Sequence, residues 1–209
     1  MLVRAGVVKT WLVRRLARVR GLRYRWHLPA DYSWALRPDV CPCDADFCDY
    51  LRERDIAKKS IFHFGSGGHH VVGLRNRVDR LENEILAITA SPREHAQYVE
   101  RVVREPSFGK HYKVLFADIY DLAHRSLPEF DLVTLFHLCE FSPMAGQLRR
   151  MDDAVVMELF RSKLGAGGRL LFYEGSLGRP GTERIIERAV AEGKISFEEK
   201  YRSLLVYRV

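Results

Sequence analysis

From Ser60 onward, short apolar runs alternate with helical patterns, and this alternation limits the folds that the chain can adopt. A strand, a helix and a second strand in succession form a βαβ unit, whose strands pair in parallel and are covered on both faces. The helical patterns are clearest over residues 93–104 and 151–164. The sequence therefore predicts a doubly wound α/β fold with a mostly parallel sheet. Its predicted parallel strands are residues 61–64, 85–89, 114–117, 132–136 and 170–173.

Two further β-rich runs end the chain, residues 196–201 and 204–207. Only Arg202 and Ser203 separate them, and two residues are too few for a crossover helix. These runs are therefore predicted to form an antiparallel hairpin at the edge of the sheet, which brings the predicted number of strands to seven.

The first predicted strand runs directly into a glycine cluster formed by Gly65, Gly67 and Gly68, and a helical pattern follows over residues 71–81. Glycine lets the backbone turn sharply and approach a ligand closely, because it has no Cβ. A strand, a glycine turn and a helix N-terminus commonly hold a nucleotide-like ligand. We therefore expect a ligand crevice at the carboxyl end of this strand.

The net charge of +7 belongs to the start of the chain. Eight of the 34 basic residues precede the first acid, Asp31, which leaves 26 basic against 27 acidic residues. The sequence thus divides into a basic helical extension, residues 1–58, and a nearly neutral domain, residues 59–209. The neutral domain argues against a nucleic-acid partner.

Residues 3–25 are predicted to form the basic helix of this extension. Charges interrupt its apolar residues too often for a secretory signal or a membrane span. Two interpretations remain: a peripheral anchor on anionic lipid, or a helix that packs on the domain or on a partner subunit. Four cysteines are few for a disulfide framework, so the sequence favours a cytoplasmic protein, with membrane association through the helix as the alternative.

Three of the cysteines, Cys41, Cys43 and Cys48, lie close together. Their spacing is not that of a zinc knuckle and no fourth ligand is obvious, so no metal ligand is assigned. The segment is instead predicted to be a loop and the start of a helix that reaches Ala57, with Asp44 or Asp46 as its N-cap.

Over residues 60–209 the order of these parts resembles the class I S-adenosylmethionine-dependent methyltransferases. The resemblance implies the family's fold and its cofactor, with a cofactor loop at Gly65–Gly68 and Asp118 near the adenine. The loop into the fifth strand, Gly165-Ala166-Gly167-Gly168, is its most specific part. The five matching places are residues 62–68, 85–91, 116–119, 130–133 and 164–171.

Three positions depart from the family pattern. His63 and Thr89 stand where the family has acids, and His69 replaces the third loop glycine. An uncharged threonine is a weaker acceptor for ribose hydroxyls than a carboxylate, so weak cofactor binding is expected, and Thr89→Asp is expected to strengthen it. The cofactor-binding residues implied by the resemblance are His63, Gly65, Ser66, Gly67, Gly68, Thr89 and Asp118.

Polar side chains follow the first and fourth predicted strands, which are neighbours in this fold. They are predicted to converge on one crevice, where imidazole, thiol and carboxylate groups could act as acids and bases or bind a metal. His137 and Glu140 are the candidate catalytic bases. The converging set is His63, His69, His70, His137, Cys139 and Glu140.

The resemblance implies methyl transfer from S-adenosylmethionine, and the predicted acceptor is a small molecule. The Asn/Asp-Pro-Pro-aromatic run of nucleobase-methylating members is missing after the fourth strand, where residues 141–144 read Phe-Ser-Pro-Met. The alternative is a non-catalytic or metal-binding protein that keeps the fold without using the cofactor.

Overall fold

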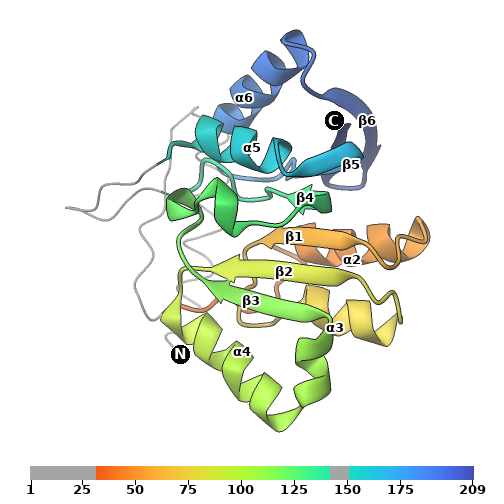
Figure 1. Ribbon diagram of the computed structural model, residues 1–209, viewed down its shortest axis with the longest axis vertical. Helices are drawn as coiled ribbons and strands as arrows, with labels where there is room; N and C mark the ends of the chain where they lie inside the picture. Colours follow the sequence, from red (N-terminus) through yellow and green to blue (C-terminus); the bar gives the residue numbers. More distant parts are fainter. Residues whose placement is uncertain (1–31, 142–150) are drawn as a thin grey trace, which may run out of the picture.

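One seven-stranded sheet runs through the residues that the computed structural model describes, 32–141 and 151–209 (Figure 1). Its strand order is β3-β2-β1-β4-β5-β7-β6. The first five strands pair in parallel, and β7 pairs antiparallel with both β5 and β6. This confirms the predicted doubly wound sheet and its terminal hairpin. The strands are β1 (Ser60–Phe64), β2 (Glu84–Thr89), β3 (Tyr112–Phe116), β4 (Phe130–Thr134), β5 (Leu164–Tyr173), β6 (Ser196–Tyr201) and β7 (Leu204–Arg208).

Helices cover both faces of this sheet (Figure 1). Alternate side chains of β1 reach two separate cores: Ile61 packs with α2 and α3, and Phe62 packs with α5 and α6. Continuous burial on both faces explains why the central strands read as unbroken apolar runs. The helices are α2 (Cys43–Glu53), α3 (Val71–Val78), α4 (Pro92–Arg104), α5 (Asp153–Arg161) and α6 (Arg179–Ala191), with short 3₁₀ turns η1 (Pro106–Lys110), η2 (Ile119–Asp121) and η3 (His124–Ser126).

Helix α2 packs into the core beside α3, with Phe47 and Leu51 almost fully buried. The predicted N-cap was wrong: Pro42 occupies the cap, and Asp44 and Asp46 lie in the first turn. There their carboxylates still face the positive end of the helix dipole. The helix ends at Glu53, short of the predicted Ala57.

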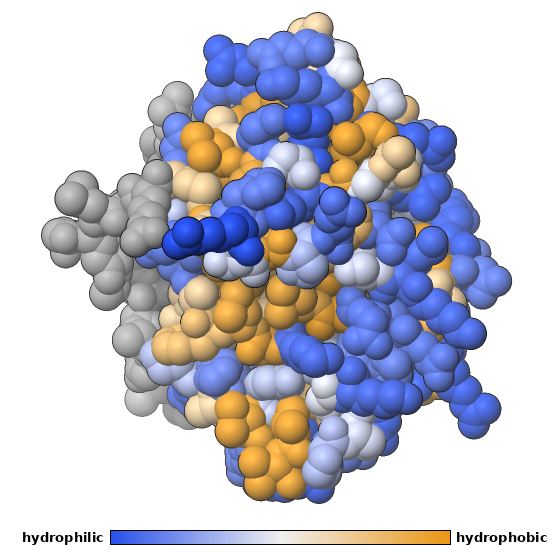
Figure 2. Space-filling model, viewed as in Figure 1, coloured by the Kyte–Doolittle hydropathy of each residue, from blue (hydrophilic) through white to orange (hydrophobic). Residues whose placement is uncertain are grey.

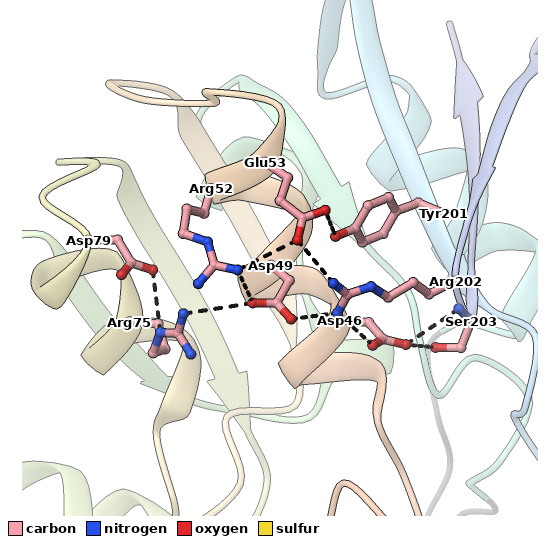
Figure 3. A network of polar contacts seen from close by, with 9 residues as sticks. All are labelled: Asp46, Asp49, Arg52, Glu53, Arg75, Asp79, Tyr201, Arg202 and Ser203. Atoms are coloured by element: carbon pink, nitrogen blue, oxygen red, sulfur yellow. Dashed lines mark hydrogen bonds and ion pairs between the residues drawn. The ribbon is translucent and has the colours of Figure 1, made fainter.

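Ionic contacts tie the solvent side of α2 to the hairpin turn (Figure 3). The Arg202 guanidinium contacts Asp49 and Glu53, and Tyr201 Oη donates to Glu53 Oε2 over 2.5 Å. Part of the predicted extension therefore packs against the domain. The boundary at residue 58 stays a prediction, and the basic helix over residues 3–25 lies outside the described residues.

The predicted loop before the fifth strand belongs to β5 itself. Phe130 of β4 pairs with Leu164 of β5, and Leu132 of β4 pairs with Arg169 of β5. Two residues of β4 therefore span the same length as five residues of β5. The glycine-rich segment therefore forms a bulge, which takes up residues that have no partner on β4.

Apolar and hydrophilic side chains are mixed over the surface in Figure 2, with apolar atoms gathered over α4. Val99 and Val103 on this helix are 43% and 74% exposed. Within the two described ranges, no helix has the length and apolar character needed to cross a membrane.

Replacing Gly73 by alanine is expected to destabilise the fold, although alanine is the better helix former. A Cβ at this position of α3 would lie about 2.6 Å from Cδ2 of the buried Tyr112 ring. Overpacking of this kind costs about 1–3 kcal/mol, against a gain of about 1 kcal/mol in helix propensity. Urea unfolding should therefore show a net loss of up to about 2 kcal/mol. Gly165→Ala, where a Cβ meets open space, should be nearly neutral. An unchanged or raised stability of Gly73→Ala would contradict the packing described.

Candidate functional site

The glycine turn after β1 lies where the strand order reverses between β1 and β4, which is the usual place for a ligand in a doubly wound sheet. Gly65 has φ +95°, a conformation that favours glycine. Among the described residues, a Cβ at Gly65 would have a single neighbour within 4 Å, His137 Cδ2 at 3.9 Å, which is an ordinary van der Waals contact. The neighbouring Ser66 hydroxyl is buried without a hydrogen-bond partner in the described residues. In the described part of the chain, Gly65 and Ser66 thus offer a position without a clash and an unsatisfied polar group.

The other two glycines of the turn are explained by contacts within the protein. A Cβ at Gly67 would collide with the His69 ring, and one at Gly68 would collide with Ser33 Oγ and the Gln97 amide. Backbone conformation accounts for Gly65 and internal contacts account for Gly67 and Gly68, and of the three only Gly65 could carry a Cβ without a clash among the described residues.

A short segment, Tyr32-Ser33-Trp34, crosses the turn and is called the strap below. Gly68 N donates to Trp34 O over 2.9 Å, and Trp34 N donates to Glu94 Oε1 over 2.9 Å. Ser33 Oγ donates to Gln97 Oε1 over 2.7 Å. The strap thus joins the glycine turn to the N-terminal half of α4.

Glu94 is a residue of this site that the sequence interpretation missed. It is 4% exposed, and Thr89 Oγ1 donates to its Oε2 over 2.6 Å. Burial raises the pKa of Glu94, while the hydrogen bonds from Thr89 and Trp34 oppose that rise. The pattern of Ser91 at the N-cap and Glu94 three residues later is a capping-box signature, which could have singled it out.

Glu94 supplies a carboxylate beside the position where the resembled family has one at the end of β2. A Thr89→Asp change would therefore place a second carboxylate against a buried acid. This removes the reason to expect stronger cofactor binding from that substitution.

Asp118 lies past the end of β3, and its side chain caps η2 by accepting a hydrogen bond from Tyr120 N over 3.0 Å. This capping contact gives the residue a structural role. Its predicted place near an adenine ring stays a prediction.

His137 and Glu140 follow β4 and contact each other, with His137 Nδ1 3.2 Å from Glu140 Oε2. The other oxygen of Glu140 accepts from Ser176 Oγ over 2.6 Å and from Leu177 N over 2.9 Å. Burial disfavours the charged imidazole, but Glu140 and Cys41 outweigh it and raise the pKa of His137 well above its usual value. Glu140 is therefore a group that orients His137, with both of its oxygens engaged.

His63 and His69 lie on either side of Asp44, from the first turn of α2. The Nε2 atoms of the two histidines are 3.6 and 3.5 Å from the Asp44 carboxylate. Burial, with smaller contributions from His69 and His137, lowers the pKa of His63 to about 3. Burial and the Cys41 thiol raise the pKa of Asp44 to about 7. The predicted convergence therefore includes an acid from α2.

Two cysteines complete this crevice. Cys41 Sγ and Cys43 Sγ are 3.5 Å apart, and Cys43 Sγ lies 3.8 Å from His137 Nε2. Among the described residues, one group of His, Cys, Asp or Glu side chains has ligand atoms close enough together to hold a metal ion, and it consists of Cys41, Cys43 and His137.

Two members of the predicted set lie elsewhere. The buried His70 ring packs against Tyr98 and Tyr112, with ring centroids 6.0 and 6.1 Å away. Cys139 belongs to the core on the opposite face of the sheet, close to Gly181 of α6. Neither residue therefore joins the crevice.

Comparison with known proteins gives structural matches only. The sequence matches no protein-family model and no curated protein. A Staphylococcus aureus protein provisionally assigned as a caffeoyl-CoA O-methyltransferase superimposes with a TM-score of 0.59 at 7% identity, covering 95% of this chain and 91% of that protein. A Pyrococcus horikoshii protein provisionally assigned as an RNA methyltransferase gives 0.53 at 14% identity, covering 92% and 94%.

A third match, coclaurine N-methyltransferase bound to N-methylheliamine and SAH, has a TM-score of 0.44 and 16% identity. It covers 67% of this chain, which spans only 38% of that enzyme's length. The chain has the fold of the class I S-adenosylmethionine-dependent methyltransferases. At these identities the first two matches, with TM-scores of 0.59 and 0.53, establish the fold. The activity and the acceptor are separate questions.

Proposed function

We propose that this chain transfers a methyl group from S-adenosylmethionine to a small-molecule acceptor. The observation that carries the proposal is the turn after β1, at the switch point of the sheet. Among the described residues, a Cβ at Gly65 would clash with nothing there, and the Ser66 hydroxyl is buried and unsatisfied. Gly65 and Ser66 would hold the amino-acid end of the cofactor. Thr89 and Glu94 would hold its ribose, and Asp118 would lie near its adenine.

Bound S-adenosylmethionine supplies an electrophilic methyl group on a sulfonium ion. The protein's contribution would be to hold the acceptor in line with that group. His137 would lie beside the acceptor, because among the described residues its ring is the neighbour of the Cβ position of Gly65, 3.9 Å away. Glu140 would act as the positioning residue for His137.

Charge favours a small acceptor over RNA. Beyond Asp31 the chain is nearly neutral, whereas nucleic-acid binding depends on basic side chains that neutralise phosphates. Calorimetry with S-adenosylmethionine and S-adenosylhomocysteine tests the cofactor. No heat at millimolar ligand, with folded full-length protein, would reject methyl transfer and favour the alternative of a protein that keeps the fold without this cofactor.

Glu94→Gln is expected to weaken binding of S-adenosylhomocysteine about ten- to hundredfold. Losing a charged hydrogen-bond partner costs about 1.5–3 kcal/mol, and about 1.4 kcal/mol corresponds to a factor of ten in affinity. Titration calorimetry measures the change, with thermal melting to confirm folding. The matched control is Glu100→Gln on the same helix, since Glu100 is exposed and pairs with Arg104. Equal affinities for the two variants would exclude Glu94 from the cofactor site.

A further inference from the structure

We propose that Cys41, Cys43 and His137 bind a zinc ion. The site brings together the start of α2 and the loop after β4, which are far apart in sequence. The inference rests on these side chains and holds whether or not the proposed methyl transfer is correct.

The distances between the three ligand atoms suit tetrahedral zinc. Zinc binds cysteine sulfur at about 2.3 Å and histidine nitrogen at about 2.0 Å, so neighbouring ligands of a tetrahedron lie about 3.5–3.8 Å apart. Here the Cys41–Cys43 sulfur distance is 3.5 Å, and Cys43 Sγ lies 3.8 Å from His137 Nε2. All three atoms lie within 4.8 Å of one another. The side chains are therefore close to the spacing that the ion requires.

The imidazole has the support that metal-binding histidines usually have. A ligating histidine commonly directs its second ring nitrogen at a carboxylate, which fixes the ring and its tautomer. His137 Nδ1 lies 3.2 Å from Glu140 Oε2, and Glu140 is held in turn by Ser176 and Leu177. The Nε2 atom is thereby directed to the two sulfurs.

The two cysteines are held by well-ordered backbone. Cys41 N donates to Arg37 O over 2.8 Å, and Cys43 is the first residue of α2, which is packed into the core. Cys43 is 2% exposed, Cys41 is half-buried, and the His137 side chain is 23% exposed. The site is thus sheltered but can be reached from solvent.

Three protein ligands leave one tetrahedral position. The Asp44 carboxylate lies 3.6 Å from Cys43 Sγ, but it does not belong to the group of possible ligands found among residues 32–141 and 151–209. Sites of this kind take water or a small ligand as the fourth partner. Binding zinc through Nε2 would use the lone pair that His137 needs as a base. In that case His137 would hold the zinc ion beside the acceptor and would not act as a base.

The test is metal analysis of the untagged full-length chain, purified after growth with added zinc and dialysed against metal-free buffer. The wild type should hold about one zinc per chain. Cys41→Ser and His137→Ala should lose at least nine-tenths of it, while Cys48→Ala should keep it, since Cys48 Sγ faces Val71 O away from the cluster. Glu140→Gln should weaken zinc binding about ten- to hundredfold in competition with a chelator.

Measurements on the wild type keep the proposal testable if a variant fails to fold. Cobalt substitution should give thiolate-to-metal charge-transfer absorption. Zinc should also protect Cys41 and Cys43 from alkylation, while leaving the reactivity of Cys48 and Cys139 unchanged. A wild-type chain that binds no zinc on titration, or folded Cys41→Ser and His137→Ala variants that bind it as tightly as wild type, would overturn the site. Zinc binding without any heat from S-adenosylhomocysteine would support this site while rejecting the proposed function.

Discussion

Replacing Phe47 by alanine is expected to lower the free energy of unfolding by about 3–5 kcal/mol, because it removes a large ring from a closed core. Phe47 is 0% exposed and stacks on His63, with ring centroids 6.0 Å apart and planes 7° apart. Its ring also meets Phe136 edge-on at 5.8 Å. For a chain of this size, the melting temperature should fall on the order of 10 °C.

Chemical and thermal unfolding of the full-length chain measure this effect. The matched control is Phe197→Ala, since Phe197 is 56% exposed on β6; it should change stability much less. The comparison also tests the predicted domain boundary. If residues 1–58 formed an extension independent of the domain, Phe47→Ala would leave the main unfolding transition where it is.

Gly65→Val is expected to reduce binding of S-adenosylhomocysteine more than a hundredfold. Valine would crowd the region between the turn and His137, and it is poorly suited to φ +95°. Calorimetry compares it with Gly165→Val, which places the same side chain where nothing lies within 4 Å. Gly65→Ala serves if the valine variant does not fold. Near wild-type affinity in a folded Gly65→Val protein would place the cofactor elsewhere.

Most of the fold could be predicted from the sequence, because the hydrophobic pattern that indicates each strand and helix is local. Apolar runs separated by helical segments predict parallel strands, and a two-residue connection between residues 201 and 204 permits only a hairpin. Errors arose where backbone geometry decides the outcome. Pro42 takes the cap position that was predicted for an aspartate, and the bulge at Gly165–Gly168 depends on the pairing of β5 with β4.

The site was predictable only in part. His137 and Glu140 follow a recognisable strand, so their place at the sheet edge could be predicted. The partners of His137 could not, because Cys43 lies 94 positions away and reaches it only through the packing of α2. Likewise, Glu94 reaches the end of β2 through hydrogen bonds to Thr89 and to the strap, which no local pattern specifies.

The strap has a consequence for the kinetics of ligand entry. Gly68 N and Glu94 Oε1 are both engaged with the backbone of Trp34. Glu94 Oε1 can accept a second hydrogen bond, but a ligand that uses the single N–H donor of Gly68 must first displace the strap. The observed affinity is then the intrinsic affinity reduced by the fraction of molecules in which the strap is open. Association measured by stopped flow should level off at high ligand concentration, at the rate with which the strap opens. Ser33→Ala, which removes the contact with Gln97, should raise that limiting rate.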